Sequence, residues 1–185
     1  MKKKTTTFYL PFSLEGYELC HPVEPFDFEN LILQVNGIPR ATAWRPIDAK
    51  VIHKDEGRKL SESDAPWLGS HALILRQRAV DVMRGLLDEF GELLPLSCAE
   101  AKLYIYNPTR VLDALDVDAS SVLRFSDGQL MTVNRYSFKT EVINGVHAFK
   151  ISDLRASPTF VSEVFVQTWN SAGLRGLDFK KVWSE

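Results

Sequence analysis

The C-terminal segment from Phe160 to Trp183 constrains the fold of this chain most strongly. Its sequence, FVSEVFVQTWNSAGLRGLDFKKVW, places side chains at i, i+3, i+4 and i+7 along one helical face. These side chains belong to Phe165, Thr168, Trp169 and Ala172. Ser162 can cap the first helical turn, and Gly173 can adopt the left-handed conformation that ends a helix. The segment therefore predicts a helix over about 162–172 followed by a strand, and it contains no nucleophile, base or metal ligand.

A second amphipathic helix is predicted over about 76–90, after the short apolar run 72–75. Its apolar stripe consists of Ala79, Met83, Leu86, Leu87 and Phe90. Charged residues on the opposite side, namely Arg78, Asp81, Arg84 and Asp88, can pair at spacings of three and four. Gly91 ends the helix. The order of apolar run, helix, glycine and strand echoes the C-terminal segment, so both segments are expected to frame the central sheet in the same way. A true duplication and the common order of any helix followed by a strand both stay open.

Strands are predicted at Thr6–Leu10, Leu31–Val35 and Leu103–Tyr106, and the segment 40–70 favours short strands or loops over a long helix. Two hairpins are expected where Asp127-Gly128 and Asn144-Gly145 suit two-residue type I′ turns.

The sequence also predicts a register for the second hairpin, around Asn144-Gly145. Phe138, Thr140 and Val142 would share one face with His147, Phe149 and Ile151, while Lys139, Glu141 and Lys150 would lie on the other. On the apolar face, His147 is expected to be a hydrogen-bonded structural residue rather than a general base.

These patterns predict an α+β fold. A central antiparallel sheet with β-hairpins would be flanked by the two amphipathic helices, after an irregular, β-rich N-terminal third. The chain has 185 residues, of which 45% are hydrophobic, so one core is sufficient. We expect a single domain over 1–185, with a less regular part at 1–69 and a more strongly patterned part at 70–185.

Charge and hydropathy narrow the possible partners. A net charge of -2 and a pI near 6.1 give no basic field for nucleic acid. Lys2, Lys3 and Lys4 are followed by a stretch too polar for a signal peptide, and no window approaches ~18 apolar residues. We therefore expect a cytoplasmic protein that contacts no membrane. Cys20 and Cys98 are expected to be free thiols, with a disulfide or redox pair as the alternative.

The sequence lacks the common motifs for hydrolase, nucleotide and zinc chemistry. The histidines are scattered singly at His21, His53, His71 and His147, so no metal site is expected. The aspartates between Asp113 and Asp127 do not fit a calcium loop, because Ser121 stands where glycine is required. We expect no cofactor and no enzymatic activity. Two alternatives stay open, namely a small enzyme whose site assembles only in three dimensions and a structural or assembly adaptor.

Several segments between about 70 and 183 resemble an immunity-protein family of bacterial polymorphic-toxin systems, typified by a myxobacterial protein. The most specific are TRVLDALD, from Thr109 to Asp116, and FVSEVFVQTWNSAGLRGLDF, from Phe160 to Phe179. RAVDVMRGLLDEFGELLPL and a DG-containing hairpin that ends in RYSFK follow the same order. The resemblance implies an α+β protein without enzymatic activity that binds and neutralises a cognate toxin. The first 60 residues match weakly, and neither the toxin nor the oligomeric state is implied.

An acidic segment near the N-terminus is the candidate toxin-binding site. No lysine or arginine occurs between Lys4 and Arg40. Acidic and aromatic residues accumulate there, namely Glu15, Tyr17, Glu18, Glu24, Phe26, Asp27, Phe28 and Glu29. Aromatic anchors within an acidic rim suit a basic, nuclease-like toxin. The alternative is an ordinary acidic loop whose aromatic side chains are buried.

Overall fold

The computed structural model describes residues 6–154 and 156–185, and it confirms the α+β class. Its helices are α1 (Asp27–Gln34), α2 (Gln77–Phe90), α3 (Thr140–Ile143) and α4 (Glu163–Ser171). Its strands are β1 (Thr7–Ser13), β2 (Leu19–Pro22), β3 (Ala49–Ile52), β4 (Lys54–Asp55), β5 (Arg58–Lys59), β6 (Leu73–Arg76), β7 (Gly91–Pro95), β8 (Leu103–Pro108), β9 (Val111–Leu112), β10 (Ser121–Arg124), β11 (Leu130–Arg135), β12 (Ala148–Ile151), β13 (Phe160–Ser162) and β14 (Leu177–Ser184). In place of one central sheet, the described strands form a five-stranded sheet, a three-stranded sheet and three two-stranded ribbons.

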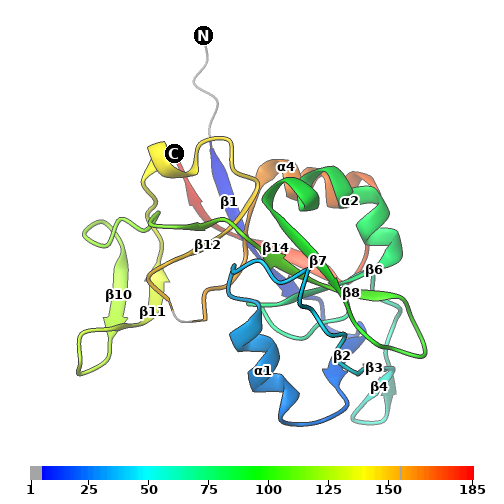
Figure 1. Ribbon diagram of the computed structural model, residues 1–185. Helices are drawn as coiled ribbons and strands as arrows, with labels where there is room; N and C mark the ends of the chain where they lie inside the picture. Colours follow the sequence, from blue (N-terminus) through cyan, green and yellow to red (C-terminus); the bar gives the residue numbers. More distant parts are fainter. Residues whose placement is uncertain (1–5, 155) are drawn as a thin grey trace.

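Two strand–helix–strand units organise the larger sheets (Figure 1). In the first unit, β6 and β7 both pair antiparallel with β8, which lies between them. In the second unit, β13 and β14 both pair antiparallel with β1. The two segments that echo each other in the sequence therefore do frame their sheets in the same way, although each frames a sheet of its own. The strand between the two outer strands comes from different places in the two units: β8 directly follows β7, whereas β1 comes from the other end of the described chain.

The helices α2 and α4 share one hydrophobic core, and Figure 1 shows them side by side on the upper side of the molecule. Ser162 caps α4 by accepting a hydrogen bond from the Phe165 amide at 3.3 Å. Gly173 follows with a φ of 63°, as the helix-stop signal predicts. Phe165 and Trp169 are fully buried against this core. Both predicted amphipathic helices are confirmed.

The helix α1 covers the face of the three-stranded sheet that points away from α2. There, Leu31 and Val35 pack with residues of β2, β3, β6, β7 and β8. The predicted strand at Leu31–Val35 is therefore wrong. A strand would place Leu31, Leu33 and Val35 on one face. In the helix, Leu31 and Val35, four positions apart, are buried, whereas Leu33 is 49% exposed.

The other side of the five-stranded sheet carries an aromatic cluster. Phe8, Phe138 and Phe149 meet edge to face, with ring centroids 5.1–6.2 Å apart. Leu115, from the TRVLDALD segment, lies in the same cluster and forms a β-bridge with Phe138. Phe138 therefore pairs with Leu115 and not with the strand after Asn144-Gly145, as the predicted hairpin requires.

The predicted hairpin around Asn144-Gly145 is wrong. Residues 140–143 form the single helical turn α3, and the turn that follows is type II, not type I′. Type I′ requires a positive φ at both central residues, but φ is -63° at Asn144 and 76° at Gly145. One consequence concerns Lys150, which was expected on a polar face and is instead only 3% exposed.

The hairpin around Asp127-Gly128 is confirmed as the pair β10 and β11. Its loop has three residues rather than two, because the Phe125 amide bonds the Gln129 carbonyl at 2.9 Å and Gly128, with a φ of 86°, follows the turn. Figure 1 shows this β10–β11 ribbon standing away from the body of the molecule.

Candidate functional site

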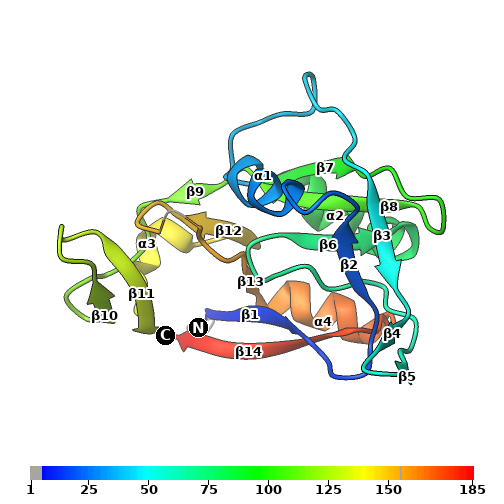
Figure 2. The ribbon, with the colours of Figure 1, turned by 90° about the horizontal axis from the view of Figure 1, so that it is seen from below.

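The structure divides the acidic segment into two groups at opposite ends of β2 (Figure 2). Glu15, Tyr17 and Glu18 precede β2 and lie beside Ser61, with which Tyr17 forms a β-bridge. The other five predicted residues, from Glu24 to Glu29, follow β2 and lie on α1 or in the loop that leads into it. Because extended chain rises roughly 3.3 Å per residue, about 16 Å separates Glu18 from Val23. The eight predicted residues therefore do not form one surface.

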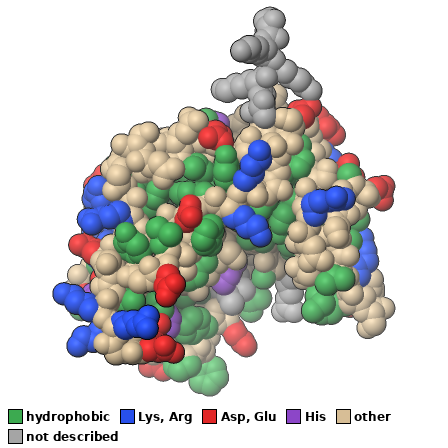
Figure 3. All heavy atoms as spheres, turned by 180° about the vertical axis from the view of Figure 1, so that it is seen from behind, with side chains coloured by type: hydrophobic (Ala, Val, Ile, Leu, Met, Phe, Trp, Pro, Cys, Tyr) green, Lys and Arg blue, Asp and Glu red, His purple; other side chains and the backbone are tan. Residues whose placement is uncertain are grey.

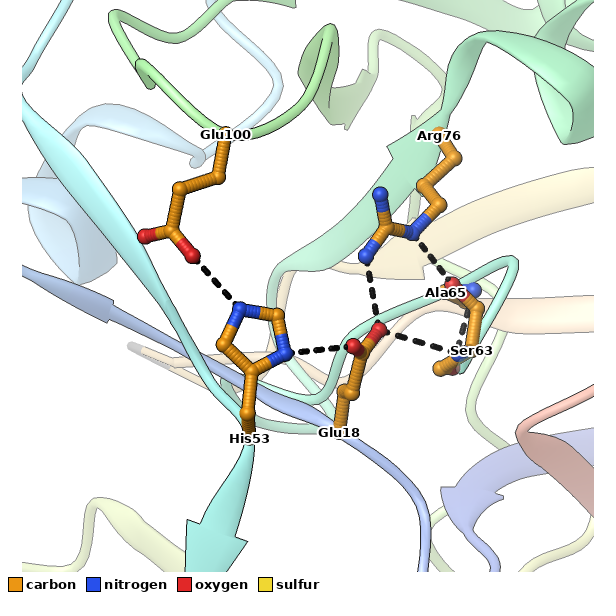
Figure 4. A network of polar contacts seen from close by, with 6 residues as sticks. All are labelled: Glu18, His53, Ser63, Ala65, Arg76 and Glu100. Carbon is orange, nitrogen blue, oxygen red and sulfur yellow. Dashed lines mark hydrogen bonds and ion pairs between the residues drawn. The ribbon is translucent and has the colours of Figure 1, made fainter. Parts of the chain in front are cut away.

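Glu18 is the centre of a buried polar network rather than a surface charge (Figure 4). Its Oε2 accepts hydrogen bonds from Arg76 Nη2 at 2.6 Å and from the Ser63 amide at 3.1 Å. Burial by itself would raise the pKa of Glu18, but these bonds and the Arg76 charge outweigh it and lower the pKa below its ordinary value. With only 5% of its surface exposed, Glu18 does not steer a partner, and its predicted role is wrong.

His53 bridges two carboxylates in the same network. Its Nδ1 lies 2.7 Å from Glu18 Oε1, and its Nε2 lies 2.5 Å from Glu100 Oε2. The hydrogen bond to Glu100 and the one to Glu18 raise the pKa of His53. Because both ring nitrogens face carboxylates, the imidazolium form is favoured and neither nitrogen is left to act as a general base. The network instead fastens the β2–β3 ribbon to β6.

The second acidic group gives α1 an exposed face with both apolar and acidic side chains. Phe26 is 85% exposed, and Leu33, two helical turns further on, is 49% exposed. We define the α1 surface by its exposed residues, which are Val23, Glu24, Phe26, Glu29 and Leu33. Isolated apolar side chains on a surface need no explanation, but an almost fully exposed phenylalanine within an acidic rim is typical of a protein-binding surface.

The other two predicted residues of this group support α1 rather than its exposed face. Phe28 is half-buried and packs edge to face against His21, with ring centroids 5.3 Å apart. Asp27, in the first turn, accepts a hydrogen bond from Asn30 Nδ2 at 3.2 Å. Asp27 and Glu29 also complement the helix dipole, which partly replaces the missing side-chain cap at Phe26.

A groove of about 490 Å³ runs beside the α1 surface, between α1 and the loop 39–48. Asp27 and Gln34 line its helical side, and Trp44 lines the loop side together with Arg40 and Arg45. The hydrogen bonds that hold the loop in place include those from Trp44 Nε1 to the Pro95 carbonyl and from Arg40 Nε to the Gln34 carbonyl, both at 2.7 Å. A partner on the α1 surface would therefore meet a preformed groove at its edge.

The β10–β11 ribbon carries a second exposed apolar group, which the sequence patterns did not identify. Leu123 and Phe125 are each 51% exposed, and Met131 is 56% exposed. In Figure 3 the ribbon forms the lobe at the right, where basic and hydrophobic side chains lie together. Arg124 and Arg135 supply positive charge, so this surface has the opposite sign to the α1 surface.

Among the described residues, no group of three or more His, Cys, Asp or Glu side chains could hold a metal ion. Over the same residues, no helix is both long enough and apolar enough to cross a membrane. Cys20 and Cys98 are free thiols, as predicted, and burial followed by the proximity of Cys98 raises the pKa of Cys20 to about 12.

The fold and this surface define an α+β protein with an acidic, apolar helix face. Residues 96–184 match the Immunity protein family (Imm11). The resemblance to an immunity-protein family is therefore confirmed over this stretch, which includes TRVLDALD and the whole β13–α4–β14 unit. The match begins after β7, so β1 to β7 and the α1 surface lie outside it. A search of curated proteins found no match to this chain.

Proposed function

We propose that this protein neutralises a cognate bacterial toxin by binding it stoichiometrically, and that the toxin docks on the α1 surface. The observation that carries the proposal is Phe26, which is 85% exposed at the start of α1 and is flanked on the α1 surface by the exposed acids Glu24 and Glu29. The match to an immunity protein family supports an immunity role, and such a role needs a toxin partner. Phe26 and Leu33 would enter apolar pockets of the toxin, while Glu24 and Glu29 would form the rim.

The charge of the α1 surface indicates the kind of toxin. A basic partner, such as a nuclease-like toxin with a cationic cleft for nucleic acid, would be attracted to Glu24 and Glu29 over distances of about one Debye length, ~8–10 Å. Complementary charge would accelerate association with such a toxin. Occupying or distorting the cationic cleft would then stop the toxin.

We further propose that the protein has no enzymatic activity of its own. The clearest candidate for acid–base chemistry, His53, has both ring nitrogens engaged by carboxylates. Reproducible turnover by the purified protein that disappears in a His53→Gln variant would contradict this proposal.

Co-expression with the toxin encoded beside it tests the proposed function. Cells that produce the active toxin are expected to survive when they also produce this protein, and the two purified chains are expected to elute as one stoichiometric complex. A Phe26→Asp variant, which places a carboxylate at the centre of the contact, is expected to fold but not to protect. Full protection without any detectable complex would contradict stoichiometric binding.

A further inference from the structure

A cavity of about 220 Å³ lies between the end of α1, β9 and the loop that follows β12. Its polar lining includes Asn36, His71, Lys150 and Ser157, and none of the described residues that line it is an aspartate or glutamate. Val35, Val111 and Ile151 form apolar parts of the wall. A water molecule occupies about 30 Å³ of liquid, so the cavity has room for a polyatomic ligand.

Lys150 brings a positive charge into this cavity, and no carboxylate among the described lining residues balances it. The side chain is 3% exposed, and its Nζ donates to the main-chain carbonyls of His71 at 2.7 Å and Ser157 at 2.8 Å. An ammonium group has three N–H donors, so one remains after these two bonds. Desolvation lowers the pKa of Lys150 to about 7, and no acidic side chain offsets this effect. A buried ammonium in this position would be stabilised strongly by an anion.

His71 provides a second polar atom that lacks a partner. Its Nε2 is buried and forms no hydrogen bond with any residue that the structure describes. Desolvation and the nearby charge of Lys150 lower the pKa of His71, which favours the neutral ring. In the tautomer protonated at Nε2, this atom is a donor. Buried polar atoms are rarely left without a partner, and an acceptor atom of a ligand in the cavity would provide one for His71 Nε2.

We propose that this cavity binds a small oxyanion, a carboxylate or a phosphate, held by Lys150 Nζ and His71 Nε2. The ammonium supplies the charge and one charge-assisted hydrogen bond, and the imidazole supplies a second donor. The apolar wall limits the ligand to a small anion. Because Val35 and Asn36 directly follow α1, a bound anion also braces the end of the helix that carries the proposed toxin contact.

Calorimetric titration of the full chain with inorganic phosphate and, separately, with acetate at constant ionic strength tests this site. Saturable binding of one of the two anions is expected, and the stronger one identifies the class. Lys150→Met should weaken the binding at least tenfold because it removes the charge. The exposed Lys139, which pairs with Asp113 at 3.0 Å, provides the matched control, and Lys139→Met should leave the affinity unchanged.

A second variant keeps the test decisive if Lys150→Met fails to fold. His71→Leu removes the ring nitrogen but retains the main-chain carbonyl that Lys150 binds, so the fold is expected to persist while anion affinity falls several-fold. Equal affinity in the wild type, His71→Leu and Lys139→Met would show that the anion binds elsewhere. Folded wild-type protein that binds neither anion at millimolar concentration would likewise overturn the proposal.

Discussion

The helices α1 and α4 have nearly the same length, eight and nine residues, but they use their apolar side chains in opposite ways. The helix α4 buries Phe165 and Trp169 completely, whereas α1 leaves Phe26 and Leu33 in solvent. Burial of apolar area stabilises a fold, and exposed apolar area stabilises only a complex. Burial therefore makes α4 part of the scaffold, whereas exposure leaves the outer face of α1 available for the proposed toxin contact.

The largest expected effect is on the scaffold side of this comparison. Trp169→Ala should lower the free energy of unfolding by about 3–5 kcal/mol, because it leaves a cavity in the core between α2, α4 and the sheet. Denaturant titration measures this change. Trp169 Nε1 has no hydrogen-bond partner among the described residues, so Trp169→Phe should cost much less. Equal stability of the alanine variant and the wild type would show that α4 does not hold the fold together.

On the recognition side, the double variant Phe26→Ala, Leu33→Ala should change stability little but reduce toxin affinity by about 30-fold or more, which is the loss of one interface hot spot of about 2 kcal/mol. Leu123→Ala on the β10–β11 ribbon, at an equally exposed apolar position, is the matched control and should bind the toxin normally. If Leu123→Ala lost toxin binding and the double variant kept it, the β10–β11 ribbon would be the binding surface instead of α1.

Charge-reversal variants distinguish long-range electrostatic attraction of the toxin from direct contact with it. Glu24→Lys with Glu29→Lys should slow association with a basic toxin by about tenfold at low salt, and the deficit should shrink as salt screens the wild-type attraction. Surface-plasmon kinetics at two salt concentrations measure this effect. Glu15→Lys, which reverses an exposed acid at the other end of β2, should have the smaller effect. Identical rates for all variants at low salt would rule out steering by α1.

The smallest effect concerns the polar network that fastens the β2–β3 ribbon, on which α1 packs. Because folding raises the pKa of His53 above its ordinary value near 6.5, its contribution to stability is complete below about pH 6.5 and is lost as the pH rises through the folded-state pKa. The difference in unfolding free energy between the wild type and His53→Gln should therefore be largest near pH 6 and shrink by pH 8. A difference that grows with pH would contradict this arrangement.

The contrast between α1 and α4 also explains what the sequence could predict. Local signals agree in α4, where Ser162 caps the first turn, the apolar stripe follows helical spacing and Gly173 ends the helix. In α1 they conflict, because Phe26 lacks a side-chain cap bond and Leu31, Leu33 and Val35 alternate as in a strand. An exposed apolar residue such as Leu33 disturbs the apolar pattern on which helix prediction depends.

Long-range packing accounts for the other errors. The sequence correctly placed a turn at Asn144-Gly145, but it could not show that Phe138 pairs with Leu115 or that Lys150 would be buried. In the acidic segment, Glu24, Phe26 and Glu29 are exposed, as the predicted binding role requires. Glu18 looks the same in sequence, and only its contacts with Arg76 and His53, 58 and 35 positions away, distinguish it.

Hydrogen exchange of the protein, free and in complex with its toxin, locates the docking surface. If the toxin docks on the α1 surface, binding slows exchange across α1 and the loop 39–48, while the amides of α4, already protected in the core, change little. Protection confined to the β10–β11 ribbon, with no change over residues 23–35, would contradict the assignment of recognition to the α1 surface.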